Sequence, residues 1–144
     1  MLSDLDASEA ALAVARDNAG RAGVAGRIDL CTGDLLEGAG VFDVLVVNLP
    51  YVSAAEWQEL QPEIRDHEPR EALVGGATGT EVIERLLRQA PAHLEPKGVL
   101  AVEMGHTQGA RLLVTARACF PDAEACVIKD LAGLDRVLVV RRGG

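Results

Sequence analysis

Apolar residues in this chain alternate between short continuous runs and longer stripes with helical spacing. The short runs have the length and aliphatic content of strands, and they cover 28–31, 42–47, 99–102, 127–128 and 137–140. The run at 42–47 is β-branched and almost free of charge, which is typical of a strand buried on both faces of a parallel sheet. Helical spacing appears at about 7–21, 81–90 and 107–118.

The connections between these elements favour an α/β fold. Asp6 with Glu9 forms a D-x-x-E capping arrangement before the first helix, and residues 1–4 resemble the end of a strand. The last two runs are joined by Asp130–Asp135, which is too short for a crossover and therefore predicts an antiparallel pair. In the helix after Thr107, the residues assigned to the inner face are Ala110, Leu113, Val114 and Ala118.

A long polar stretch interrupts this alternation between Val52 and Thr80. It contains several helix and strand breakers, namely Pro62, Pro69, Gly75, Gly76 and Gly79. Loops of this length inside a compact domain are usually functional or disordered. We therefore expect one domain, residues 1–144, with an insertion at about 52–80 built from short pieces.

Three polar residues follow three successive predicted strands: Asp4, Asp34 and Asn48. Ligands of open α/β sheets bind at the carboxyl ends of parallel strands, so these residues should converge on one rim. Asp4 could accept hydrogen bonds from both hydroxyls of a ribose, and Asp34 could accept one from the exocyclic amine of an adenine. A helix-capping acid and an ordinary Gly-Asp turn are the simpler explanations. The convergence is more specific than any one residue.

The loop Asn48-Leu49-Pro50-Tyr51 suits chemistry on an amide. An amide nitrogen is a poor nucleophile because its lone pair is delocalised into the carbonyl. The Asn48 side-chain oxygen and the Leu49 carbonyl could accept its two hydrogens and position it to attack an electrophilic methyl group. Tyr51 could pack on the substrate plane or near a sulfonium. A strand-ending turn is the structural alternative.

Composition and charge exclude several classes of function. The net charge of −8 argues against a broad nucleic-acid-binding face. Apolar runs stay well short of the roughly 20 residues of a membrane helix, and the acidic opening is unlike a signal peptide. The cysteines and histidines lack metal-ligand spacing, so no metal is expected, and Cys31, Cys119 and Cys126 are expected to be reduced and buried. We expect a cytoplasmic protein without membrane contact, of undetermined oligomeric state.

With its surroundings, the Asn48–Tyr51 loop resembles the Asn-Pro-Pro-Tyr mark of the bacterial methyltransferases that modify a glutamine of peptide chain release factors. Four further stretches share the resemblance: Gln61–Arg70, Ala72–Gly76, Glu103–Gln108 and Lys129–Arg136. The resemblance implies a Rossmann-like, S-adenosylmethionine-dependent methyltransferase sheet with a reversed final strand. A related ribosomal-protein glutamine methyltransferase shares the loop, but Lys129–Arg136 is closer to the release-factor enzyme.

The resemblance also implies roles for single residues. Asp4 matches the ribose-binding acid, and Asp34 with Leu35 matches the turn beside the adenine. Asn48 to Tyr51 match the glutamine-binding loop, in which Asn48 and Tyr51 would be catalytic and Asn48 would also contact the cofactor. Leu49 departs from the family by replacing its first proline, which removes the fixed φ.

A second departure concerns the start of the chain, which matches the end of the family's second strand. The fold is therefore expected to be N-terminally truncated, without the helical domain, the first strand and the glycine-rich loop of the family.

The leading hypothesis is a fragment of an S-adenosylmethionine-dependent methyltransferase that acts on a glutamine side chain of a release factor. One alternative is methylation of adenine amino groups in nucleic acid, which uses a similar loop but is disfavoured by the net charge of −8. The other alternative is a catalytically silent, truncated segment. Glu103, which follows a predicted strand, could shape the substrate groove, although capping of the strand end is the simpler explanation.

Overall fold

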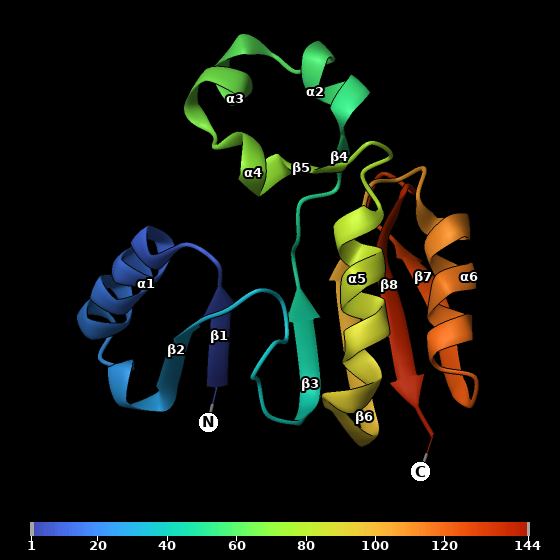
Figure 1. The fold of residues 1–144 in the computed structure, drawn as a ribbon, viewed down its shortest axis with the longest axis horizontal. Coiled ribbons are helices and arrows are strands. Elements are labelled where there is room, and N and C mark those ends of the chain that lie inside the picture. Colours follow the sequence, from blue (N-terminus) through green and yellow to red (C-terminus); the bar gives the residue numbers. More distant parts are fainter. Residues whose placement is uncertain (1, 144) are drawn as a thin grey trace. The chain divides into compact units, whose positions relative to one another are not determined.

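The structure, a computed structural model, describes residues 2–143. The chain divides into two compact units, Met1–Gly40 and Val41–Gly144, both drawn in Figure 1. Each unit has its own β-sheet, and a third, two-stranded sheet lies in the segment that follows Asn48. The expected single domain with an insertion at about 52–80 remains a prediction.

The first unit is a parallel β-α-β arrangement. It consists of β1 (Leu2–Asp6), α1 (Glu9–Arg21), a short 3-10 turn (Ala25–Arg27) and β2 (Ile28–Thr32). The two strands pair in parallel from Leu2 opposite Ile28 to Asp6 opposite Thr32. Gly23, just after the end of the helix, has a φ of +69° that suits glycine, and Val24 N–H donates to the Ala19 carbonyl at 2.9 Å.

The start of this unit corrects two predictions. The strand runs to Asp6 and does not end at Asp4. The helix is capped by Ser8, whose Oγ accepts from Ala11 N–H at 3.2 Å, so the predicted Asp6–Glu9 capping pair is wrong. Asp6 instead accepts Ser8 N–H at 2.7 Å and shapes the turn between strand and helix.

The second unit is built on a four-stranded sheet with the order β3-β6-β8-β7. The strands are β3 (Phe42–Val47), β6 (Leu94–Glu103), β7 (Ala123–Lys129) and β8 (Asp135–Arg142). β3 and β6 are parallel, whereas β8 is antiparallel to β6 and β7, which confirms the predicted terminal hairpin. β6 begins earlier than the predicted 99–102, because Leu94 already pairs with Phe42 before a register shift in the ladder.

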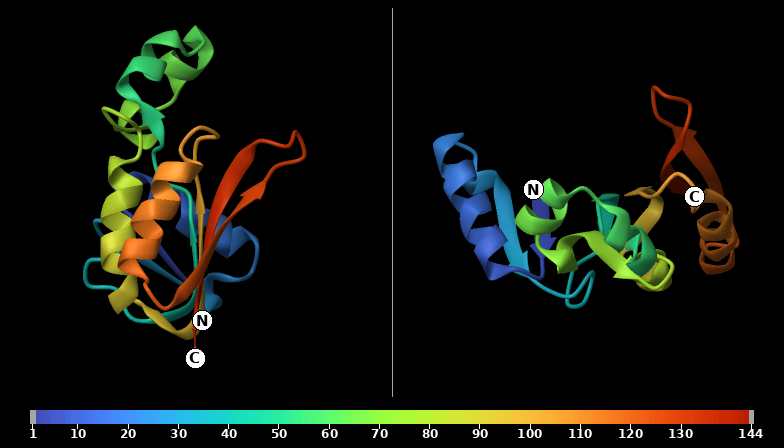
Figure 2. Two further views of the ribbon diagram at one scale, coloured as in Figure 1. Left: turned by 90° about the vertical axis from the view of Figure 1, so that its right-hand side faces the viewer. Right: turned by 90° about the horizontal axis from the view of Figure 1, so that it is seen from above.

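Helices α5 (Glu81–Gln89) and α6 (Gly109–Cys119) pack on one face of this sheet (Figure 2). Leu45, Leu100 and Val140 form one buried cross-strand row. The prediction that 42–47 is buried on both faces is wrong, since Val44 is 58% and Val46 82% exposed. Side chains alternate across a strand, and both helices cover the face that carries Leu45.

The inner face of α6 also differs from the prediction. Gly109, Leu112 and Ala116 are buried, whereas the predicted Ala110, Val114 and Ala118 are exposed and Leu113 is half-buried. The helix carries apolar residues over most of its circumference, so its sequence does not fix which side faces the sheet.

Short elements make up the segment between Asn48 and α5. They are β4 (Val52–Ser53), α2 (Ala54–Glu59), α3 (Pro62–His67), α4 (Arg70–Leu73) and β5 (Val74–Gly76), with β4 parallel to β5. Trp57 is buried in α2, and Ser53 with Glu56 forms a capping box at the start of this helix. Among the residues that the structure describes, no helix has the length and apolar character needed to cross a bilayer.

The burial pattern predicts that shortening a side chain lowers the stability of the protein by different amounts in two neighbouring strands. Leu100→Ala empties a fully buried position between β3 and β8 and should lower the free energy of unfolding by about 2–5 kcal/mol. Val46→Ala, at an exposed position, should lower it by less than about 1 kcal/mol. Urea unfolding followed by circular dichroism measures both, and equal losses would contradict the one-sided core.

Candidate functional site at the rim of the second sheet

Three polar residues lie at one end of the four-stranded sheet. Asn48 directly follows β3, and Glu103 is the last residue of the neighbouring parallel strand β6. The register pairs Val47 with Val102, so Asn48 and Glu103 leave the sheet side by side. Arg136 enters at the same end on the antiparallel strand β8, where its carbonyl accepts Met104 N–H at 3.0 Å. This rim is the candidate site.

The loop after Asn48 is held by the side chain of Gln108. Gln108 Nε2 donates to the Tyr51 carbonyl at 2.8 Å, and Gln108 Oε1 accepts Gly105 N–H at 2.9 Å. Gln108 is only 7% exposed, so both of its polar atoms are used in a place where unpaired groups would be costly. The amide thereby ties the loop to the start of α6.

Two glycines bring a second stretch of backbone against the same loop. A side chain at Gly75 would collide with the Pro50 carbonyl, and one at Gly79 would collide with the Tyr51 carbonyl. Gly79 also has a φ of +80°, a conformation that other residues adopt with strain. The backbone of the loop is thus fixed from two sides, while the Asn48 side chain at its start is exposed.

Tyr51 reaches back across the rim to β6. Its hydroxyl donates to Glu103 Oε1 at 3.0 Å. Partial burial and the Glu103 carboxylate raise the pKa of the Tyr51 phenol above its ordinary value, and the nearby Arg136 guanidinium opposes this shift. Tyr51 is therefore a neutral phenol at physiological pH and is not a general base.

Arg136 is itself held by the turn between β7 and β8. Its Nε and Nη2 donate to Asp130 Oδ2 at 3.2 and 3.1 Å. The other oxygen, Asp130 Oδ1, accepts the backbone N–H groups of Ala132 and Leu134 at 2.9 and 3.0 Å. The Leu134 N–H first, and Arg136 after it, lower the pKa of the Asp130 carboxyl. The hairpin turn thus supplies a fixed cation to the rim.

The first unit has a rim of its own at the carboxyl ends of β1 and β2. Gly33 N–H donates to the Asp6 carbonyl at 3.2 Å, which joins the two strand ends just before Asp34. Leu35 follows with a φ of +57°, a left-handed conformation that is rare for leucine. Asp4 lies in the middle of β1 opposite Leu30, so Asp6 takes the strand-end position that we expected for Asp4.

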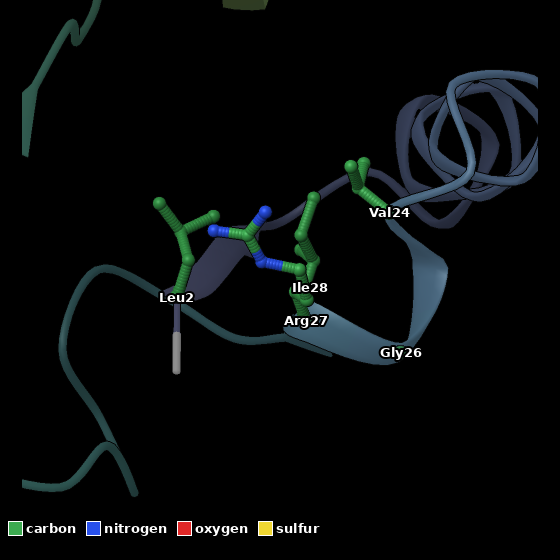
Figure 3. Close-up of a pocket in the computed structure, with 5 residues that line it drawn as sticks. All are labelled: Leu2, Val24, Gly26, Arg27 and Ile28. Atoms are coloured by element: carbon green, nitrogen blue, oxygen red, sulfur yellow. The ribbon is translucent and has the colours of Figure 1, made fainter.

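The first unit also has a surface hollow, which lies away from the strand ends near Asp6 and Asp34. Leu2, Val24, Gly26, Arg27 and Ile28 line it, as Figure 3 shows. Leu2 and Ile28 begin β1 and β2, so the hollow lies at the opposite end of these strands from Asp6 and Asp34. It does not coincide with the predicted cofactor residues.

The cysteines correct another prediction, since Cys31 is exposed and Cys119 and Cys126 are only partly buried. All three are free thiols. Within residues 2–143, no group of three or more His, Cys, Asp or Glu side chains is arranged to hold a metal ion.

The sequence predictions placed Asn48 and Tyr51 correctly at the carboxyl end of β3. They missed the roles of Gln108 in the loop and of Arg136 at the rim. A signal for both was present, because Glu103–Gln108 and Lys129–Arg136 are two of the stretches that resemble the methyltransferase family.

Sequence comparison finds relatives that cover nearly the whole chain. The chain is 43% identical over 143 residues to the release factor glutamine methyltransferase of Nitratidesulfovibrio vulgaris, covering 96% of this chain and 48% of the relative. It is 37% identical over 140 residues to the ribosomal protein uL3 glutamine methyltransferase of Bordetella pertussis, covering 96% of this chain and 45% of the relative. The chain therefore spans about half the length of the curated relatives it matches, and its matches lie in their C-terminal part. No protein-family model matches it.

Solved structures agree on the fold. A methyltransferase from Pyrococcus furiosus superposes with a TM-score of 0.70 at 18% identity, covering 99% of this chain and 62% of that one. An O-methyltransferase from Bacillus cereus, solved with SAH, gives a TM-score of 0.58 at 16% identity, covering 97% of this chain and 61% of that one. The chain has the Rossmann-like α/β fold of S-adenosylmethionine-dependent methyltransferases, as the family resemblance implied.

We expect the loop after Asn48 to loosen when the hydrogen bonds of Gln108 are removed. Gln108→Leu should speed amide hydrogen exchange at Leu49 and at residues 51–53 by about 5- to 30-fold, the equivalent of losing about 1–2 kcal/mol of local stability. Gln108→Glu keeps the acceptor for Gly105 N–H but loses the donor to the Tyr51 carbonyl. It should therefore speed exchange in the loop and leave exchange at Gly105 unchanged.

Gln58→Leu, at an exposed position of α2, is the matched control and should leave this exchange unchanged. Unaltered exchange in Gln108→Leu would show that the side chain does not hold the loop.

Proposed function

We propose that this chain, which resembles the C-terminal half of bacterial release factor glutamine methyltransferases over nearly all of its length, binds and methylates the side-chain amide of a glutamine. The observation that carries the proposal is the fixed Asn48-Leu49-Pro50-Tyr51 loop at the carboxyl end of β3. A preorganised loop of this kind presents hydrogen-bond acceptors to a substrate without first having to order them.

The chemistry follows from the acceptors of the loop. The Asn48 side-chain oxygen and the Leu49 carbonyl accept the two hydrogens of the substrate amide, which orients its nitrogen and favours the positive charge that develops there. S-adenosylmethionine, when bound, would supply an electrophilic methyl group on a sulfonium: the new N–CH₃ bond replaces the S–CH₃ bond, S-adenosylhomocysteine leaves, and one amide hydrogen is released to solvent as a proton. Neutral Tyr51 packs against the planar amide or the sulfonium and takes no proton.

The rim of the first unit has the chemistry for the nucleoside part of the cofactor. Carboxylates accept the hydroxyl hydrogens of a ribose, and Asp6 offers one at a strand end, with Asp4 two residues before it on the same face. Asp34 with Leu35 would contact the adenine, and the strained φ of Leu35 favours a functional turn. Asn48 would also contact the cofactor.

A release factor is the substrate we propose, because the relatives with this name include the one at 43% identity and Lys129–Arg136 resembles that group. A ribosomal protein is the alternative, since the uL3 enzyme is 37% identical. Both substrates belong to translation and would place the reaction in the cytoplasm. Methylation of adenine in nucleic acid remains a weaker candidate at a net charge of −8, and a catalytically silent segment is the remaining alternative.

Asn48→Ala tests the role of the loop. Loss of one positioned acceptor should slow methyl transfer about 100- to 1,000-fold, while the Kd for S-adenosylmethionine changes less than about threefold. Single-turnover transfer to a release factor and calorimetry of cofactor binding measure the two quantities. They should be made on this chain and on a chimera that joins it to the N-terminal half of the Nitratidesulfovibrio vulgaris relative. Transfer at the unmutated rate would refute the role of Asn48.

Leu49→Pro tests the conformation of the loop. The resemblance places proline at this position, and a fixed φ lowers the entropy lost when the loop is held in place. We expect turnover at saturating cofactor to be equal to or higher than that of the unmutated protein. A large loss would mean that this loop has a geometry unlike that of the family.

A further inference from the structure

The acceptors of the Asn48 loop do not by themselves distinguish a glutamine from a glutamate. The Asn48 amide carries both an acceptor oxygen and a donor NH₂ group, and a rotation of its side chain by half a turn exchanges them. A free phenol is ambiguous in the same way, since its hydrogen can point toward the substrate or away from it. Discrimination by the phenol needs another group that fixes the direction of its hydrogen.

Glu103 supplies that group. An ionised carboxylate only accepts hydrogen bonds, so its contact at 3.0 Å obliges the Tyr51 hydroxyl to donate toward β6. The phenol oxygen can then offer only lone pairs to the substrate. The negative charge of Glu103, which leaves the sheet beside Asn48, adds electrostatic repulsion against a second carboxylate.

We propose that Glu103 is a positioning residue that makes this rim selective for an amide over a carboxylate. Glu103 orients the Tyr51 hydroxyl so that the phenol oxygen presents only lone pairs to the substrate. The inference rests on the proposed function, since it names what the same site selects. It gives a chemical role to Glu103, which does not itself touch the reacting atoms.

Arg136 supplies a cation at the same rim. Its guanidinium is fixed by two donors on one oxygen of Asp130, while the other oxygen of Asp130 organises the hairpin turn. Its positive charge opposes the rise in the pKa of Tyr51 that burial and Glu103 cause. The backbone of Tyr51 is fixed separately by Gln108, so Glu103 controls only the ring and its hydroxyl.

The chain offers a direct readout of this contact, because Tyr51 is its single tyrosine. The ultraviolet absorbance of phenolate therefore reports the pKa of Tyr51 alone. Glu103→Gln removes a charge that raises this pKa, so the pKa should fall. Arg136→Met removes a charge that lowers it, so the pKa should rise.

Matched controls lie on the same two strands. Glu95→Gln on β6 and Arg141→Met on β8 make the same charge changes at exposed positions and should leave the titration unaltered. If the pKa of Tyr51 does not move in Glu103→Gln, or moves equally in Glu95→Gln, the contact is absent and the inference is wrong.

Selectivity is measured by equilibrium binding of a release factor and of its variant with glutamate in place of the methylated glutamine. The unmutated chain should prefer the glutamine form, and Glu103→Gln should reduce that preference at least about tenfold. Binding of the cofactor should not change. A lower pKa with an unchanged preference would overturn the selectivity.

Failure of the proposed function gives a different result. If the unmutated chain binds neither form of the release factor, the proposed substrate and its selection are both wrong. The titration still decides whether Glu103 orients Tyr51, because it needs no substrate.

Discussion

The register between β3 and β6 is the constraint on which the candidate site depends. Val47 pairs with Val102, and Val102 pairs with Leu138 on β8, so the buried rows of the sheet align Asn48, Glu103 and Arg136 at one rim. A slip of one residue would turn the buried row to the exposed face of β3, which the hydrophobic core opposes. Core packing thereby sets the positions of polar residues that take no part in it.

The loop at this rim is fixed at two points with different consequences. Gln108 and the close approach of Gly79 fix the backbone at Tyr51, whereas Glu103 fixes the phenol. A site that binds a glutamine by accepting its amide hydrogens needs both the fixed backbone and the fixed phenol. The acceptor atoms must be in place, and the hydroxyl hydrogen of Tyr51 must point away from the substrate. The proposed methylation and the proposed selection of amides are thus two consequences of one preorganised loop.

Sequence reasoning succeeded where local patterns determine structure and failed where tertiary packing decides. The run at 42–47 and the short connection at 130–135 were sufficient to predict β3 and the β7–β8 hairpin. The inner face of α6 was mispredicted because apolar residues lie around most of the helix and do not reveal its orientation. The strand end at Asp6 was missed because Asp6 was read as a helix cap. The role of Gln108 depends on Tyr51, 57 positions away, and the family resemblance of Glu103–Gln108 does not reveal that contact.

The most direct test of the account is the identity of the methylated group. This chain, alone and in the chimera with the Nitratidesulfovibrio vulgaris relative, is given methyl-labelled S-adenosylmethionine together with a release factor, ribosomal protein uL3 and adenine-containing DNA. Mass spectrometry then locates the label. The account predicts a single methyl group on the side-chain amide of a glutamine, and on the release factor in preference to uL3. Label on adenine, or no label on any glutamine, would contradict it.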